Sequence, residues 1–273
     1  MGSIESGLRD VRFLDDLSYQ DTFVHRLDPR AKILVTFGFV VSVVSFHRYA
    51  LAALTPYIFY PLFMMGAGRL PPRLFLKRLL VLSPFVVLIG AFNPLFDRKE
   101  IARLGSLGFT GGWVSFAAIL VRYCLTVSAA LVLIACTGFN SLCYGLERMG
   151  VPRVFVVQLL LLYRYLFVLT DEASRMARAR ALKSFGRGTM ELRVFVPLAG
   201  ALLIRTMDRA QRIYGAMLAR GFDGTVRLRT RLRVGGQDVA FTALWIGAFA
   251  FFRMVNVPAA LGTLFLKLYP WLG

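Results

Sequence analysis

The sequence predicts an all-α fold: a polytopic helical membrane protein with about five to six spanning helices and two long amphipathic cytoplasmic helices. Three observations support this prediction. The 273-residue chain is 57% hydrophobic, and its mean hydropathy of +0.63 is too high for an ordinary soluble domain. Several uncharged stretches are long enough to cross a bilayer. Two long, basic helical segments follow most of them.

The uncharged stretches locate the spanning helices. A helix needs roughly 17–25 apolar residues to cross ~30 Å of hydrocarbon. Three stretches contain no Asp, Glu, Lys or Arg over 20, 18 and 24 residues, respectively: 49–68, 79–96 and 123–146. Two shorter ones, 33–46 and 239–252, have 14 residues each. They can cross the membrane if Lys32 and Arg253, next to them in the sequence, extend to the interface.

Local signals set the order of these helices. In the segment HRLDPRAK (25–32), Asp28 can cap a helix and Pro29 suits its first turn, so the first span is expected to run from there to about residue 46. Pro56 and Pro61 predict kinks in the second helix. The third and fourth are expected at about 79–96 and 113–137, with a Gly-rich stretch, 105–112, between them.

Arg122 lies inside the fourth predicted span. An arginine within the membrane is energetically costly, so its side chain should face the interior of the bundle or reach an interface. The sequence leaves both placements open.

After residue 137 the pattern changes to two long amphipathic helices, expected at 153–185 and 191–220 and separated by Gly186 and Gly188. Six apolar residues recur at helical spacing on the later turns of the second helix: Leu203, Met207, Ala210, Tyr214, Met217 and Leu218. Three arginines fall on the opposite side: Arg205, Arg209 and Arg212. We therefore expect one face to pack on apolar material and the other to face water. Gly221 follows the helix where a left-handed residue is favoured.

Basic residues concentrate in this part of the chain. The net charge is +18, and residues 171–233 hold fourteen basic and five acidic side chains, a balance of +9. The positive-inside tendency places this block in the cytoplasm. We expect a multi-pass protein of the bacterial inner membrane with an N-terminal segment (1–30), transmembrane helices (31–137), a cytoplasmic region (138–237) and a C-terminal membrane region (238–273). Residues 1–30 lack an apolar run, so the first spanning helix is expected to direct insertion.

Most catalytic and metal-binding motifs are absent from the sequence. There is no phosphate-binding loop, no His-Glu-x-x-His and no Gly-x-Ser-x-Gly. With two histidines and three cysteines that lack Cys-x-x-Cys spacing, no metal, cofactor-binding or catalytic residue is assigned, and the cysteines are expected to be apolar packing residues: Cys124, Cys136 and Cys143. Asp171 is expected to pair with Arg175 at i,i+4 rather than to act with Glu172. No nucleic-acid motif accompanies the positive charge.

The two long helices share one feature near their C-terminal ends. Small residues flank an arginine in Ala-Arg-Ala at 179–181 and in Ala-Arg-Gly at 219–221. Small neighbours permit close approach of another surface, and a guanidinium can form paired bonds to carboxylates. The pattern favours a protein-docking site, with an anchor for lipid headgroups as the alternative.

Six stretches in order resemble a known family. They are HRLDPRAK (25–32), FNPLF (92–96), LERMGVPRVF (146–155), LLYRYLFVLTDEASRM (161–176), ARA (179–181) and AMLARGFDG (216–224). Together they cover about residues 20–235, and they resemble the transmembrane (T) component of energy-coupling factor (ECF) transporters, most closely the cobalt-type CbiQ family. Each stretch is short, and their common order and spacing make the resemblance specific.

The resemblance implies a division of labour. In that family two such signatures end two cytoplasmic coupling helices, and their arginines dock on a pair of ATPase subunits. It therefore assigns ATPase docking to Ala179, Arg180, Ala181, Ala219, Arg220 and Gly221. The first signature departs from Ala-Arg-Gly, and Arg178 offers a competing register.

The same resemblance implies that this chain is non-catalytic and carries no cofactor. Two ABC-type ATPases would bind ATP, and a membrane-embedded substrate-binding (S) subunit would bind Co²⁺ or Ni²⁺, with or without a small accessory membrane subunit. The alternatives are the same role in a nickel or vitamin importer, and a basic membrane scaffold that binds anionic lipid. No nucleic-acid partner is expected.

Overall fold

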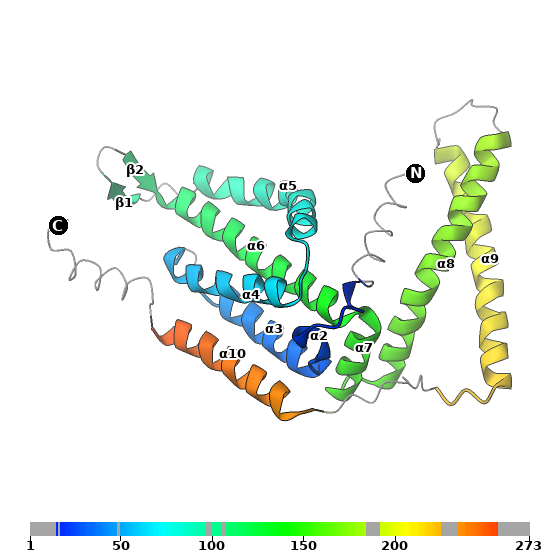
Figure 1. Ribbon diagram of the computed structural model, residues 1–273. Coiled ribbons are helices and arrows are strands. Elements are labelled where there is room, and N and C mark those ends of the chain that lie inside the picture. Colours follow the sequence, from blue (N-terminus) through cyan, green and yellow to red (C-terminus); the bar gives the residue numbers. More distant parts are fainter. Residues whose placement is uncertain are drawn as a thin grey trace. The chain divides into compact units, whose positions relative to one another are not determined.

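In the computed structural model, the described residues are 15, 17–47, 50–96, 100–104, 107–183, 192–224 and 234–255. They fall into two compact units. The bundle unit contains the described residues of 14–142 and 232–273, and the hairpin unit contains those of 143–231. Nearly all of these residues are helical, which confirms the predicted fold class (Figure 1).

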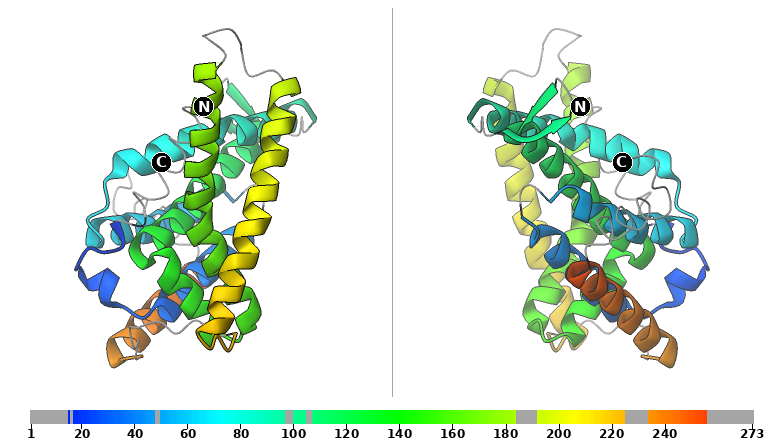
Figure 2. Two further views of the ribbon diagram at one scale, coloured as in Figure 1. Left: turned by 90° about the vertical axis from the view of Figure 1, so that its right-hand side faces the viewer. Right: turned by 90° about the vertical axis from the view of Figure 1, so that its left-hand side faces the viewer.

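The bundle unit is built on α3, α6 and α10, which lie side by side (Figures 1 and 2). Its elements are α2 (Phe23–Arg26), α3 (Pro29–Val44), η1 (Ala52–Ile58), α4 (Phe59–Ala67), α5 (Pro72–Phe96), α6 (Gly111–Thr137), the start of α7 (Phe139–Arg148) and α10 (Gly236–Met254). The second predicted helix begins as the 3-10 helix η1, which contains Pro56. This proline lacks a backbone N–H and cannot continue a regular α-helical ladder.

Aromatic side chains form the core between α3, η1, α4 and α10. The Phe39 ring lies 4.7 Å from that of Tyr60, and Trp245 meets Tyr60 edge to face at 4.9 Å. The two tyrosine hydroxyls are paired, since Tyr60 bonds Thr36 at 2.9 Å and Tyr57 donates to the Phe249 carbonyl at 3.1 Å. The core therefore buries large apolar rings without leaving their hydroxyls unsatisfied.

A small β-hairpin interrupts the helices before α6. Strands β1 (Glu100–Leu104) and β2 (Leu107–Thr110) pair antiparallel, with Leu104 opposite Leu107. The sequence predicted only a Gly-rich stretch here. Two residues separate the strands in the sequence, and the first of them is glycine, which is a recognised hairpin signal.

Three of the described helices are long and apolar enough to cross a membrane, namely Phe75–Pro94, Gly111–Thr137 and Arg153–Lys183, and Ala52–Ala67 is a shorter apolar helix. The larger number of spans remains a prediction. The third of these helices falls in the region 138–237, which the sequence assigns to the cytoplasm. The apolar residues that make it a candidate span lie mainly in its first half.

The prediction that Lys32 extends to an interface is wrong. Its side chain is only 1% exposed, and Nζ donates to the Cys136 carbonyl at 2.9 Å and approaches the His25 carbonyl at 3.4 Å. The reason is that the last turn of a helix has carbonyl groups without helical partners, and Cys136 lies in the last turn of α6. A lysine on α3 can satisfy such a carbonyl in the interior of the bundle.

The hairpin unit consists of the end of α7 and two long antiparallel helices, α8 (Arg153–Lys183) and α9 (Leu192–Ala219). These two helices contact each other (Figures 1 and 2). Their bounds agree closely with the predicted 153–185 and 191–220. Residues 184–191, with Gly186 and Gly188, lie outside the described residues.

The cysteine prediction holds for two of three residues. Cys136 and Cys143 are buried, whereas Cys124 is exposed. All three are free thiols.

Candidate functional site

The structure places the two predicted docking signatures far apart. Ala179, Arg180 and Ala181 lie on exposed positions of α8, which continues as helix through Lys183. Arg220 directly follows the last residue of α9 and is also exposed. Because the helices are antiparallel, the two arginines lie toward opposite ends of the hairpin (Figure 1). The 28 residues of α9 set their separation at roughly 40 Å.

Backbone geometry defines the end of α9. Gly221 has φ +76°, which confirms the predicted left-handed residue. Its N–H donates to the Leu218 carbonyl at 2.9 Å, and the Phe222 N–H donates to the Met217 carbonyl at 3.0 Å. This pair of bonds is a Schellman motif, which makes Arg220 the C-cap residue of α9.

Replacing Gly221 with Ala should destabilise this helix end. No atom lies within 4 Å of the position a Cβ would take, so the cost comes from the left-handed backbone, about 1 kcal/mol. Hydrogen exchange of the amides at 220–222 should accelerate about fivefold. Gly215→Ala is the matched control, because Gly215 lies inside α9 with equally open space, and alanine should slow exchange there. Unchanged exchange in Gly221→Ala would contradict this account of the cap.

A shared carboxylate joins the two long helices. Glu172 on α8 accepts hydrogen bonds from Arg175 at 2.8 Å and from Arg205 of α9 at 2.9 Å. The predicted pairing of Asp171 with Arg175 is therefore wrong. The carboxylate of Glu172 can bond Arg175 on its own helix at i,i+3 and also Arg205 on α9. The additional bond to Arg205 favours Glu172 over Asp171 as the partner of Arg175.

Arg205, on the arginine side of α9, bonds α8, and four residues of the apolar stripe are not covered by the described residues of the hairpin unit. Leu203, Met207, Tyr214 and Leu218 are between 51% and 63% exposed. Arg205, Arg209 and Arg212 are exposed, as expected, and Arg205 in addition bonds Glu172 of α8. An amphipathic helix whose apolar face is open presents a surface for another protein or for lipid.

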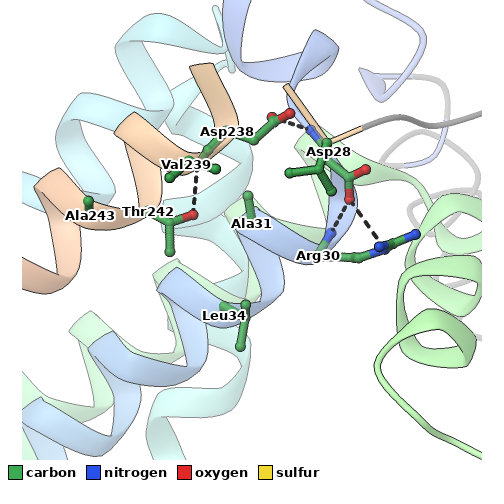
Figure 3. A pocket seen from close by; sticks show the side chains of 9 residues that line it. Asp28, Arg30, Ala31, Leu34, Asp238, Val239, Thr242 and Ala243 are labelled. Carbon is green, nitrogen blue, oxygen red and sulfur yellow. Dashed lines mark hydrogen bonds and ion pairs between the residues drawn. The ribbon is translucent and has the colours of Figure 1, made fainter. Parts of the chain in front are cut away.

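A second polar cluster lies where α3 and α10 begin. As predicted, Asp28 caps α3, because its Oδ1 accepts from the Arg30 N–H at 2.9 Å. Asp238 of α10 accepts from the Asp28 N–H at 2.7 Å and from the Gly235 N–H at 2.8 Å (Figure 3). A cavity of about 370 Å³ lies between the two helices, lined mainly by apolar side chains such as Leu34 and Val239.

His25 completes the polar surroundings of this segment. Its Nδ1 lies 2.7 Å from Thr22 Oγ1. Burial, together with the nearby charge of Lys32, lowers the pKa of His25 below its ordinary value. The imidazole is therefore held neutral near pH 7, and Lys32 supplies the positive charge beside Asp28 and Asp238.

Sequence reasoning did not find the roles of Lys32 and Asp238. The signal for Asp238 was present, since it stands three residues after Gly235 and starts an apolar run, as in a capping box. Nothing local marks Lys32, whose main partner is 104 residues away. Within the part of the chain that the structure describes, no three His, Cys, Asp or Glu side chains are grouped to hold a metal ion.

Apolar helices of spanning length define a membrane protein, and its two long helices carry exposed arginines. The profile of the CbiQ family, described as "Cobalt transport protein", matches residues 20–232. The chain belongs to the CbiQ family of transmembrane components of ECF transporters.

Individual relatives agree with this assignment. The energy-coupling factor transporter transmembrane protein EcfT of Listeria innocua is 27% identical over 83% of this chain and 90% of its own length. The EcfT of Heliobacterium modesticaldum is 29% identical over 84% and 91%, respectively. The cobalt transport protein CbiQ of Rhodobacter capsulatus is 30% identical over 72% of this chain and 79% of its own length.

Proposed function

We propose that this chain is the coupling subunit of an ATP-driven ECF importer, in which it transmits ATPase motion to a substrate-binding membrane subunit. The observation that carries the proposal is the placement of Arg180 and Arg220 toward opposite ends of one antiparallel helix pair. Sites roughly 40 Å apart fit two separate subunits better than one groove. Each tip would dock on one ABC-type ATPase, with its small neighbours allowing close contact.

The uncovered stripe of α9 supports a second contact. Leu203, Met207 and Tyr214 are exposed on a helix whose other side is held by α8. We propose that this apolar surface meets the S subunit, so that movement of the helix tips reaches the substrate site. The region 138–237 would then be cytoplasmic, in a multi-pass protein of the cell membrane.

Cobalt is the proposed substrate, because the family description and the Rhodobacter capsulatus relative both name cobalt transport. Co²⁺ would be bound by the S subunit and ATP by the ATPases, so this chain would be non-catalytic. The resemblance to EcfT proteins keeps nickel and vitamin import as alternatives with the same coupling role.

Affinity purification of the full chain from membranes in mild detergent tests the proposal. We expect two ABC-type ATPase subunits and one further membrane protein to be recovered with it, in amounts that quantitative mass spectrometry can compare. The basic-scaffold alternative predicts recovery of lipid without a stoichiometric ATPase. Absence of any ATPase from a preparation that retains the chain's other membrane partner would contradict the coupling role.

The isolated chain should bind neither Co²⁺ nor Ni²⁺ tightly. Its two histidines and three cysteines are a poor ligand set, and Cys136 and Cys143 are buried. Titration calorimetry of the purified chain should show no stoichiometric high-affinity site, whereas the complete complex should show one. A tight one-to-one site in the isolated chain would assign ion selection to this subunit instead.

A further inference from the structure

Two arginines meet at the C-terminal end of α3. Arg122 of α6 donates from Nη2 to the Phe46 carbonyl at 2.8 Å and to the His47 carbonyl at 2.7 Å. Arg253 of α10 donates to the Ser45 carbonyl and hydroxyl, both at 3.2 Å, and its guanidinium lies 4.5 Å from the centre of the Phe46 ring. The sequence left two placements open for Arg122, the interior of the bundle and an interface. In the structure its guanidinium contacts the backbone that follows α3, at one end of the bundle.

The two charges have no carboxylate partner among the described residues. Neither arginine forms an ion pair there, and each contacts its carbonyl groups through one guanidinium nitrogen. A cavity of about 670 Å³ opens beside Arg253. None of the described residues that line it is acidic, and these are Ser45, Phe46, His47, Ala50, Ala53, Phe252, Arg253 and Met254.

The helix α3 is shorter than an undistorted hydrocarbon layer is thick. Its 16 residues, Pro29–Val44, extend about 24 Å, several ångströms less than the ~30 Å thickness of the hydrocarbon layer. A bilayer adapts to such a mismatch by local thinning, which draws headgroups inward. Exposed apolar side chains in the last turns of α3 and α10 can contact acyl chains: Val41, Val44, Phe251 and Met254.

We propose that the cavity lined by Arg253 binds the phosphate group of an anionic phospholipid, with added positive charge from Arg122, which bonds the carbonyls of the cavity residues Phe46 and His47. A guanidinium forms paired hydrogen bonds with phosphate oxygens, and the adjoining apolar surface favours a lipid over a free anion. The opposite end of α3 lies beside the end of α6, from which the chain enters the region 138–237. If that region is cytoplasmic, the lipid belongs to the outer leaflet; the binding site itself does not depend on the coupling role.

Thermal unfolding of the purified full chain in detergent tests this site. Added phosphatidylglycerol should raise the Tm more than phosphatidylcholine does, and inorganic phosphate should not. In Arg122→Gln/Arg253→Gln the extra rise should disappear, with apparent affinity for phosphatidylglycerol at least about tenfold weaker. Loss of helix capping alone would lower the starting Tm without removing the response to lipid.

Two further variants control the experiment. Arg73→Gln/Lys77→Gln removes two exposed cations from the start of α5 and should keep the response, and Arg122→Lys/Arg253→Lys should keep part of it. If the double glutamine variant does not fold, Arg253→Gln alone, with bound phosphatidylglycerol counted by native mass spectrometry, should show reduced retention. An undiminished response or retention in the glutamine variants would overturn the site, and an equal response to inorganic phosphate would overturn the lipid as its ligand.

Discussion

Replacing both Arg180 and Arg220 with Glu is expected to abolish metal uptake and to detach the ATPase, while membrane insertion and abundance stay intact. Both side chains are exposed, so no buried contact among the described residues is lost. At a docked interface the change would place a carboxylate where a guanidinium was bound. Truncating one partner of a buried charged pair already costs about 2–5 kcal/mol, which lowers affinity by a factor of tens to thousands.

The control for this experiment lies on the same helix. Arg209→Glu/Arg212→Glu makes the same charge change at exposed positions of α9 outside the signature. If the arginines only attracted anionic lipid, each would contribute ~1 kcal/mol, and the two pairs should behave alike. Uptake and ATPase recovery should be measured on both. Full uptake with retained ATPase in Arg180→Glu/Arg220→Glu would contradict the docking role.

Single variants also decide the register of the first signature. Arg178 and Arg180 are both exposed on α8, and two residues on a helix point about 200° apart. Only one of them can therefore face a given partner groove. Arg180→Glu should reduce ATPase recovery far more than Arg178→Glu, and the reverse order would move the signature by two residues.

Local signals in the sequence predicted the elements that carry the docking signatures. The bounds of α8 and α9 follow from continuous helical patterns, and the left-handed Gly221 follows from the composition of the helix end. These features depend on residues within one or two turns of each other. The small hairpin β1–β2 was missed because its signal is only two residues long.

Contacts between distant segments could not be predicted in the same way. Lys32 bonds Cys136, Asp28 bonds Asp238, and Arg205 bonds Glu172, over 104, 210 and 33 residues. An isolated lysine next to an apolar stretch satisfies the snorkelling pattern equally well whether it extends outward or inward. The choice depends on a helix-end carbonyl supplied by another part of the fold.

The polar contacts of Lys32, Asp28 and Asp238 join three helices of the bundle at one end. Lys32 of α3 holds the end of α6, and Asp238 of α10 holds the start of α3. All three residues are buried, with 1%, 3% and 7% of their surface exposed. Buried charges are retained only where they are compensated, so each depends on the others.

Lys32→Met is therefore expected to lower the free energy of unfolding of the bundle by about 3 kcal/mol or more. The methionine keeps most of the side-chain volume but loses the bond to the Cys136 carbonyl and the favourable charge of the ammonium near Asp238 and Asp28. Asp28 keeps Arg30 as an ion-pair partner at 3.8 Å, so Asp238 is the carboxylate that loses most. Lys77→Ala, at an exposed lysine of α5, should change it by less than about 0.5 kcal/mol. Adding Asp238→Asn to Lys32→Met should not restore the loss, because both Asp238 oxygens accept backbone N–H bonds and the amide nitrogen of asparagine cannot accept one of them. Denaturant unfolding in detergent measures all three variants, and a Lys32→Met protein as stable as the original would show that the buried ammonium is not needed to hold these helices together.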